Sequence, residues 1–306
     1  MTIRMLALFC ALGAATAAFA ADTTPPVPPQ NLKIGIAGST SVVLVGAGDI
    51  LSPNNATTAT LIKNMIATTP GLVVFTAGDN AYPDGSASNF ATEYDPTWGA
   101  FKSRTHPSPG NHDYTTAGAP GYYGYFGAAA HGPDGYYSYD LGTSWHIVAL
   151  NSEIPANAGS PQETWLRADL AANTRPCTLA YWHRPRFSSG TKHGSTPGMQ
   201  PLWQALYDHH AEIVVSGHEH NYERFDPQTP TGTADLVNGI REFVVGTASG
   251  SNAPANYPFG TPLPNSVVRG NPWGVMKFTL SNGSYTWEFV PIAGTTFSDS
   301  GSDTCH

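Results

Sequence analysis

Five short segments of this sequence carry side chains that commonly bind metal ions or transfer protons. They are Gly48-Asp49, Gly78-Asp79-Asn80-Ala81-Tyr82, Gly110-Asn111-His112-Asp113, Trp182-His183 and Gly217-His218-Glu219-His220. Taken singly they indicate little, because an Asp or Asn beside Gly is common in turns and helix caps. The His-x-His pair is more informative, since residues i and i+2 of an extended segment point to the same side.

Together the segments provide two Asp, three His, one Asn and one Tyr, which are oxygen and nitrogen ligands without a thiolate. This set suits iron, manganese or zinc, and the mixture of donors suits two ions better than one. A glycine precedes Asp49, Asp79, Asn111 and His218, where it allows the backbone to turn sharply beside an ion. Unrelated turns and caps would have to explain every segment separately, so we predict a two-metal site.

The elements that must position these residues are short apolar runs rich in Val, Ile and aromatic residues, which are typical of buried strands. We expect strands at residues 42–45, 72–76, 145–150, 178–182, 212–215 and 242–245. Helical patterns lie between them, at 57–68, from Ser160 onward and at 201–210. Ser160, Pro161 and Glu163 have the spacing of a capping box with proline at the first helical position. The alternation of strands and helices predicts an α/β protein with largely parallel pairing in its core.

The polar segments follow the expected strands directly. Asp49 comes after the first strand, Asp79 after the second, His183 after the fourth and His218 after the fifth. Ligands of such sheets collect beyond the carboxyl ends of the strands. We therefore expect these side chains to meet at one edge.

In this order the segments resemble the calcineurin-like metallophosphoesterase superfamily, and within it the purple acid phosphatases. The resemblance extends from Asp49 to His220 and includes the run GHEHNYER. Many members of the superfamily carry a His two residues after the first Asp, where this chain has Leu51. The purple-type enzymes lack that His and have a Tyr three residues after the second Asp, which is Tyr82 here. The resemblance implies a four-layer α/β/β/α sandwich in a single domain.

The resemblance also implies which residues bind each ion. Asp49, Asp79, Tyr82 and His220 would hold the first ion, and Asp79, Asn111, His183 and His218 the second, so that Asp79 bridges. Fe3+ is the expected ion at Tyr82, because a phenol with an ordinary pKa near 10 needs a strong Lewis acid to ionise. The other ion is expected to be Fe2+, Zn2+ or Mn2+.

The implied function is that of an exported phosphatase, which hydrolyses phosphomonoesters by in-line attack of metal-bound hydroxide on phosphorus. Two cations about 3.5–4 Å apart orient the phosphoryl group and neutralise its charge. His112 follows a ligand directly, so it is expected to stabilise the transition state or protonate the leaving oxygen. His193, in a Ser/Gly-rich loop, is a second candidate for contact with phosphate. Arg184, Arg186 and Arg224 are expected mainly in surface ion pairs.

Two other functions remain open from the sequence. A phosphodiesterase or nucleotide hydrolase would use the same metal site, because the walls of the pocket and not the ligands decide between monoester and diester. A non-catalytic exported metal-binding or adhesion module is the alternative of another class. His112 and a bridging Asp79 argue against such a module, since binding alone needs neither.

The composition excludes one class of partner. The formal net charge is −8 and the sequence has no run of Lys or Arg, so a nucleic acid is not an expected partner. A small phosphate ester is compatible, because bound cations reverse the local sign of an acidic protein. The 306 residues fit one domain, which we place at 32–306. The oligomeric state is not predictable.

The N-terminal residues 1–20 read as a signal peptide. Arg4 is followed by an apolar run and by the small-x-small cleavage site Ala18-Phe19-Ala20. The run is too short to span a bilayer, so we expect a secreted or periplasmic protein without membrane contact after cleavage. Residues 21–31 form a Pro-rich linker.

The two cysteines beyond the signal peptide are Cys177 and Cys305. Export favours a disulfide between them, which would fix the C-terminal tail to the body of the domain. A buried Cys177 with a free terminal thiol at Cys305 is the alternative.

Overall fold

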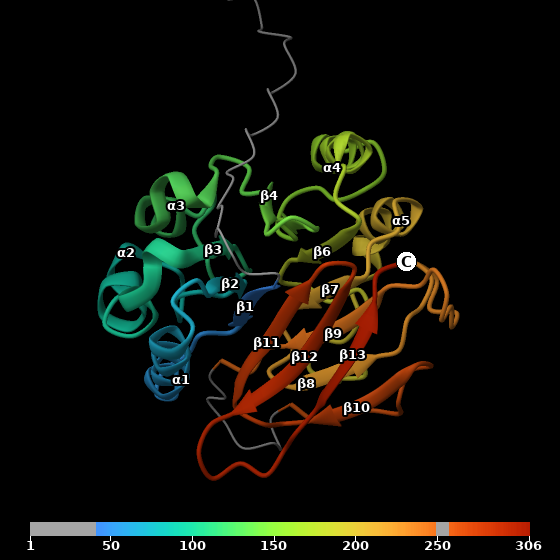
Figure 1. Cartoon of the computed structure of the whole chain (residues 1–306). Helices are drawn as coiled ribbons and strands as arrows, with labels where there is room; N and C mark the ends of the chain where they lie inside the picture. The colour runs from blue at the N-terminus through green and yellow to red at the C-terminus, as the bar shows by residue number, and fades with distance from the viewer. Residues whose placement is uncertain (1–40, 249–256) are drawn as a thin grey trace, which may run out of the picture.

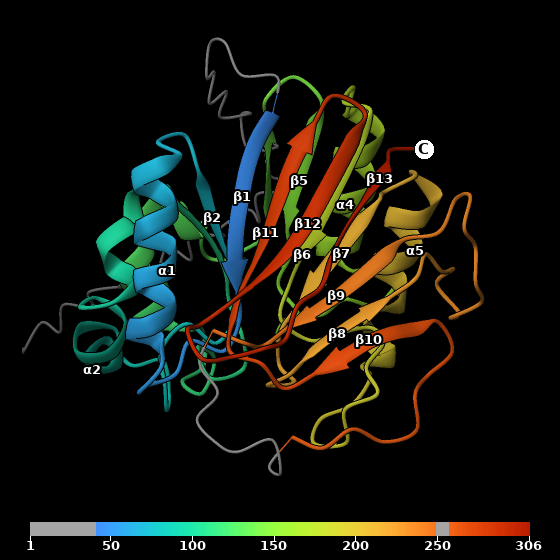
Figure 2. The same cartoon turned by 60° about the horizontal axis from the view of Figure 1, so that its bottom comes forward.

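The structure is a computed structural model that describes residues 41–248 and 257–306. The signal peptide at 1–20, the linker at 21–31 and the first residues of the expected domain lie outside the described residues. Within those two ranges, the strands form a six-stranded and a seven-stranded sheet. The sheets pack face to face with helices on both outer sides (Figures 1 and 2). This arrangement confirms the expected four-layer α/β/β/α sandwich.

The six-stranded sheet has the order β13-β12-β11-β1-β2-β3. Its strands are β1 Ser41–Ala47, β2 Val73–Ala77, β3 Thr105–Ser108, β11 Gly274–Ser281, β12 Ser284–Pro291 and β13 Ser300–Thr304. The first three pair in parallel, whereas β11, β12 and β13 join them in antiparallel pairing. The parallel half therefore places three strand exits at one edge.

The seven-stranded sheet has the order β10-β8-β9-β7-β6-β5-β4. Its strands are β4 Tyr137–Leu141, β5 Trp145–Ala149, β6 Cys177–Tyr181, β7 Ile213–Ser216, β8 Tyr222–Phe225, β9 Arg241–Val245 and β10 Ser266–Gly270. The four central strands β5, β6, β7 and β9 are parallel, as expected from the sequence, and the outer pairings are antiparallel.

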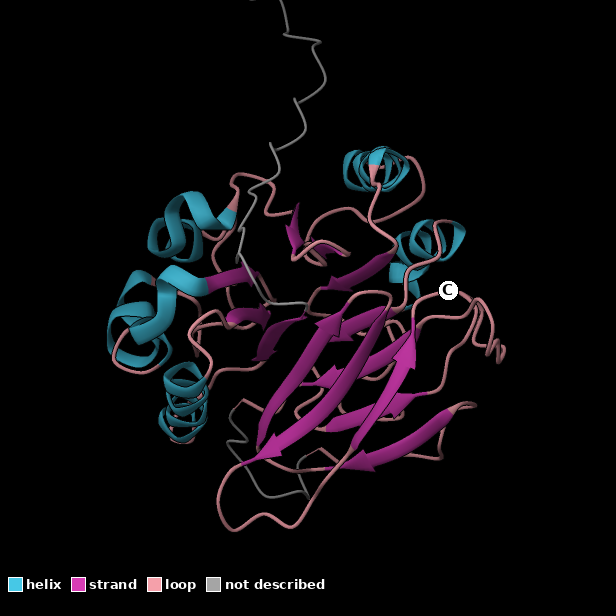
Figure 3. Ribbon diagram, viewed as in Figure 1, coloured by secondary structure: helices cyan, strands magenta, loops and turns pink. Residues whose placement is uncertain are grey.

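The helices are divided between the two outer layers (Figure 3). Helices α1 Asn55–Thr68 and α3 Pro120–Phe126 lie against the six-stranded sheet, with α2 Ala87–Asn89 beside α3, whereas α4 Pro161–Ala172 and α5 Gln200–Asp208 lie against the seven-stranded sheet. Shorter helical turns are η1 Phe90–Tyr94, η2 Trp98–Arg104, η3 Gly127–Ala130 and η4 Pro197–Met199. None of the helices in the described ranges has the length and apolar character needed to cross a bilayer.

The start of α4 follows the predicted cap in part. The Ser160 hydroxyl accepts a hydrogen bond from the backbone N–H of Glu163. The Glu163 carboxylate binds the backbone N–H of Gly159 and so reaches one residue further back than in a standard capping box. Both contacts satisfy backbone donors near the helix start.

The aromatic stretch at 121–126 is helical. It forms helix α3, and the tyrosines that follow at 137 and 139 belong to the buried strand β4. Tyr122 and Tyr137 both donate hydrogen bonds to the carbonyl of Pro107, at 3.1 and 2.9 Å. Both hydroxyl groups therefore bind the backbone of β3.

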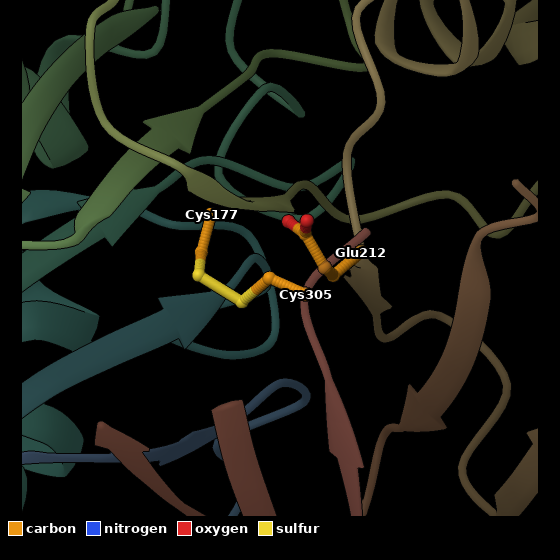
Figure 4. A group of neighbouring side chains, drawn as sticks. All are labelled: Cys177, Glu212 and Cys305. Atoms are coloured by element: carbon orange, nitrogen blue, oxygen red, sulfur yellow. A yellow bond between two sulfur atoms is a disulfide. The ribbon is translucent and has the colours of Figure 1, made fainter. Parts of the chain in front are cut away.

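A disulfide between Cys177 and Cys305 joins the two sheets. The predicted disulfide is therefore confirmed, and Cys305 is not a free thiol. Cys177 begins β6 in one sheet, and Cys305 follows β13 in the other. The Glu212 side chain lies beside this bridge (Figure 4) and accepts a hydrogen bond from the backbone N–H of Thr178. Because the two sulfurs are bonded to each other, this group is a covalent link and offers no thiolate to a metal.

A buried ionic network connects the edge strand β4 to helix α4. The His146 ring lies between two carboxylates, with Nδ1 3.1 Å from Asp140 and Nε2 2.8 Å from Asp169. Burial alone would lower the pKa of His146, but hydrogen bonds and charge from Asp169 and Asp140 raise it above its ordinary value. Arg175 also binds the Asp140 carboxylate, at 3.0 Å.

This network predicts a stability that depends on pH. Since the folded-state pKa of His146 is above the unfolded value, its stabilisation is complete below the unfolded pKa of about 6.5 and is lost as pH rises through the folded pKa. His146→Gln should lower the free energy of unfolding by about 1.5–3 kcal/mol at about pH 5.5, and by less at about pH 9. Urea denaturation at both pH values measures this, with His209→Gln, at the end of α5, as the matched control. An equal loss at both pH values would contradict the prediction.

Candidate metal centre

The seven predicted ligands converge where the carboxyl edges of the two sheets meet. In the six-stranded sheet, β1 is followed by Asp49, β2 by Asp79 and Tyr82, and β3 by Asn111. In the other sheet, β6 is followed by His183, and β7 by His218 and His220. Backbone hydrogen bonds hold the two edges together, from Gly48 N–H to the Val245 carbonyl and from Ala248 N–H to the Gly48 carbonyl. The site is therefore built across the seam between the sheets.

Four of these side chains form the first donor group around the Tyr82 phenol oxygen. This oxygen lies 3.0 Å from Asp49 Oδ1, 2.9 Å from Asp79 Oδ2 and 3.2 Å from His220 Nε2. Asp49 Oδ1 and His220 Nε2 are themselves 3.1 Å apart. These are the four residues that the resemblance assigns to one ion.

The second donor group surrounds His183 Nε2. This nitrogen lies 3.3 Å from Asp79 Oδ2, 3.1 Å from Asn111 Oδ1 and 3.1 Å from His218 Nδ1. Asp79 Oδ2 thus belongs to both groups, as a bridging carboxylate requires. That these atoms bind metal ions stays a prediction.

The backbone directs the donor atoms inward. His183 Nδ1 lies 2.9 Å from the Ala77 carbonyl, which can only accept, so Nδ1 carries a proton and Nε2 is the nitrogen that faces the centre. Asp49 Oδ2 accepts the backbone N–H of His218 and Asp79 Oδ1 that of His112, both at 2.8 Å. Each carboxylate therefore accepts a backbone hydrogen bond with one oxygen and directs the other oxygen to the centre.

Three of the predicted ligands adopt left-handed backbone conformations that non-glycine residues rarely adopt. The φ angles of Asp49, Asp79 and His218 are 61°, 51° and 71°. Such conformations concentrate at functional sites, where the surrounding structure stabilises them. Space is equally restricted, because a Cβ at Gly110 would lie 2.2 Å from Asp79 Oδ1. Glycine is therefore needed at position 110 so that the backbone can lie close to the Asp79 carboxylate.

The electrostatics of the site favour a cation. Burial, followed by the charges of Asp49 and Asp79, raises the pKa of Tyr82 well above its ordinary value. Burial alone would lower the pKa of His183, but the Asp79 carboxylate overrides it and raises this pKa to about 10. Both shifts favour positive charge beside the Asp49 and Asp79 carboxylates, which protons supply in the metal-free site and metal ions would supply in their place.

A pocket of about 250 Å³ opens beside the donor atoms. It is lined by Leu51, Asp79, Tyr82, Asn111, His112, Lys192, His193, His218, His220 and Tyr257. His112 Nδ1 donates to the Pro83 carbonyl at 2.6 Å, which leaves its Nε2 available, 3.9 Å from Asp79 Oδ2. Both predicted catalytic histidines, His112 and His193, therefore border the same pocket as the predicted ligands.

A model of the calcineurin-like phosphoesterase family matches residues 43–222 of the chain, which is more than half of its length. The chain belongs to the calcineurin-like phosphoesterase family. It is similar to purple acid phosphatase 15 of Arabidopsis thaliana, with 36% identity over 168 residues that cover 51% of this chain and 30% of that protein. Human acid phosphatase type 7 is 28% identical over 182 residues, which cover 49% of this chain and 41% of that protein.

These similarities place the phosphoesterase in the purple acid phosphatase-like branch, as the resemblance implied. The matched segments span less than half the length of either relative. Purple acid phosphatase PPD1 from yellow lupin seeds has a similar fold, with a TM-score of 0.68 and 19% identity over 92% of this chain and 55% of that chain. The GAP50 protein of Plasmodium has a TM-score of 0.68 and 16% identity, covering 87% of this chain and 89% of that chain. At these identities the two structures support the fold alone.

Membership of this phosphoesterase family implies a site for two metal ions, and the residues present fit it. Carboxylate, imidazole, amide and phenol donors are the ligand types that suit iron, zinc and manganese. Asp49, Asp79 and His183 each offer a ligand atom within 4.8 Å of the others. One oxygen of Asp79 faces both donor groups.

Two residues of the site were given no role from the sequence. The buried Asp113 carboxylate accepts hydrogen bonds from the backbone N–H groups of Gly110 and Asn80, and from the Asn80 side chain, at 2.9–3.2 Å. Burial, followed by the charge of Asp79, raises the pKa of Asp113 to about 7. Tyr257 stacks on His220 with ring centroids 4.1 Å apart. Asp113 lies within a segment singled out above, whereas no local pattern marks Tyr257.

The three arginines expected mainly in surface ion pairs all have protein partners. Arg184 pairs with Glu153 at 2.9 Å, and Arg224 pairs with Asp299 at 2.7 Å. Arg186 donates to the Pro230 carbonyl at 3.1 Å. Arg184 is the one of these three that borders the site, since its Nη1 lies 3.2 Å from His218 Nε2.

Proposed function

We propose that this protein is an exported two-metal phosphatase that hydrolyses phosphomonoesters. The observation that carries the proposal is the position of Asp79 Oδ2, 2.9 Å from the Tyr82 phenol oxygen and 3.3 Å from His183 Nε2. A carboxylate oxygen shared by two donor groups keeps two cations close, and pairs of ions about 3.5–4 Å apart recur in phosphatases.

The proposed ions have different ligands. Fe3+ would bind to Asp49, Asp79, Tyr82 and His220, because a phenolate ligand favours a strongly Lewis-acidic ion. Fe2+, Zn2+ or Mn2+ would bind to Asp79, Asn111, His183 and His218. Bound there, the ions supply a nucleophile from water near neutral pH and neutralise charge on the phosphoryl group.

Two histidine side chains would donate the proton to the leaving group and contact the phosphoryl group. With Nδ1 donating to the Pro83 carbonyl, His112 presents Nε2, which in the imidazolium form donates a proton to the leaving oxygen. His193 borders the same pocket, its ring stacked on that of His218 with centroids 4.1 Å apart, and would contact the phosphoryl group. A pocket of about 250 Å³ suits a small phosphate ester. We place the protein in the periplasm or outside the cell, on the basis of residues 1–20.

Hydrolysis of an aryl phosphomonoester by protein that carries two ions per chain tests this proposal. A protein with Fe3+ at Tyr82 should be coloured, because a phenolate bound to ferric iron absorbs visible light. Tyr82→Phe should remove that absorption band, with Tyr114→Phe as the matched control, because the Tyr114 hydroxyl bonds to Tyr123 and Asn151 and not to a predicted ligand. A colourless protein that contains zinc or manganese and hydrolyses the ester would contradict the iron assignment while leaving the phosphatase proposal standing.

The same measurements distinguish a phosphodiesterase and a non-catalytic metal-binding module from the proposed phosphatase. Faster hydrolysis of an aryl diester than of the corresponding monoester would identify a phosphodiesterase. The Plasmodium protein with the similar fold is described as an anchor in the inner membrane complex, so a non-catalytic role has a precedent in this fold. Two bound ions without hydrolysis of any phosphate ester would favour that role over an enzyme.

A further inference from the structure

The loop that carries His193 rests on a buried carboxylate. Glu219 is fully buried and stands between His218 and His220 in the sequence. Its Oε1 accepts the backbone N–H groups of both His193 and Gly194, each at 2.7 Å. The residue between two predicted ligands therefore binds the loop that borders the pocket.

The contact between Glu219 and this loop leaves no spare space. A Cβ at Gly190 would lie 2.4 Å from Glu219 Cδ, so the carboxyl group packs directly on the loop backbone. The first part of the loop is bound separately, since Glu223 Oε2 accepts the backbone N–H of Ser189 at 2.7 Å. Glu219 thus holds the end of the loop that faces the pocket.

The position of the His193 ring depends on this attachment. Thr191, Lys192 and His193 are exposed at their side chains, so little packing from outside fixes them. The ring stacks on His218, and the loop is joined to the neighbouring segment by a hydrogen bond from Thr191 N–H to the Pro258 carbonyl. Because Glu219 binds the backbone amide of His193 itself, it fixes the backbone position from which the His193 ring extends toward the predicted ions.

We propose that Glu219 is a positioning residue that holds His193 over the metal centre for catalysis. It acts through the backbone of the loop and does not contact substrate. This inference rests on the proposed phosphatase function. A displacement of about 1 Å in a catalytic geometry can lower activity about 10²-fold, so the loss of this attachment is expected to have an effect of about that size.

Glu219→Ala should lower kcat/KM for an aryl phosphomonoester about 10²-fold while the protein keeps two ions per chain. Glu219→Gln should remain close to the parent, because its amide oxygen can accept both N–H groups. In the parent, Glu219 Oε2 has no hydrogen-bond partner among the described atoms, so the amide nitrogen of Gln breaks no bond there. Loss of metal in Glu219→Ala, or equal impairment of Glu219→Gln, would overturn the proposal.

A double-mutant cycle separates positioning from general damage. If Glu219 acts through His193, Glu219→Ala should cause little further loss of kcat/KM in a His193→Ala background. Independent, multiplicative losses would overturn the proposal. Glu212→Ala is the matched control, since Glu212 is also a buried carboxylate that accepts a backbone N–H and has one unpartnered oxygen, but lies beside the disulfide. It should leave kcat/KM unchanged.

Amide hydrogen exchange gives a readout that does not depend on turnover. The amides of His193 and Gly194 should exchange slowly in the parent and in Glu219→Gln, and faster in Glu219→Ala. If the parent hydrolyses no phosphate ester, the phosphatase proposal fails and the exchange measurement alone decides whether Glu219 holds the loop. Unchanged exchange of these amides in Glu219→Ala would then show that Glu219 does not hold the loop.

Discussion

Asp79→Asn is expected to lower phosphatase activity by about 10³-fold or more and to leave fewer than two ions per chain. Asp79 Oδ2 faces both donor groups, so an amide there weakens both proposed metal positions at once. Charge stabilisation by metal ions contributes several kcal/mol to catalysis, and each 1.36 kcal/mol corresponds to a tenfold change in rate. Steady-state kinetics together with elemental analysis measure the two effects.

The control for this substitution is Asp95→Asn, which removes a carboxylate near the surface that accepts a hydrogen bond from Tyr125. It should retain both ions and full activity. If Asp79→Asn kept two ions and activity near that of the parent, the shared-carboxylate arrangement would be wrong, and the phosphatase proposal would lose its main support.

Cys305→Ser is expected to lower the free energy of unfolding by about 2–5 kcal/mol. The disulfide closes a loop with a sequence separation of 128 residues, and long loops gain the most from cross-linking because the unfolded chain is restricted most. The C-terminal strand β13 lies at the edge of its sheet, so it would lose its covalent attachment to β6. Urea denaturation measures the change.

A reductant provides the control for the disulfide. It should destabilise the parent to about the level of Cys305→Ser and leave the variant unchanged. Equal stability of the parent and the variant without reductant would show that pairing with β12 alone holds β13 in place.

The sequence predicted the parallel centre of the fold because its strands are continuous apolar runs. Strands β1, β2, β5, β6, β7 and β9 all fall within a few residues of their expected positions. Strand β13 was not predictable, since Ser300–Thr304 contains Ser, Gly and Asp and takes its conformation from pairing with β12 and from the disulfide. Helix α3 was missed because two glycines and several aromatic residues disfavour a helix that is stabilised by burial of Tyr122 and Phe126.

The candidate site was largely predictable because its residue types and their order carry the information. The positions of Asp49, Asp79 and His218 at strand exits follow from local sequence, and their meeting follows from the parallel sheets. The roles of Glu219 and Tyr257 depend on contacts between segments far apart in the chain. Such contacts leave no periodicity or spacing to detect.

The two sheets are fastened to each other at opposite ends by different chemistry. At the amino end of β6 the fastening is covalent, through Cys177 and Cys305. At the carboxyl ends, the proposed ions would draw on ligands from both sheets. One end therefore responds to thiol reductants and the other to chelators, whereas the apolar core between the sheets and the backbone hydrogen bonds of Gly48 respond to neither.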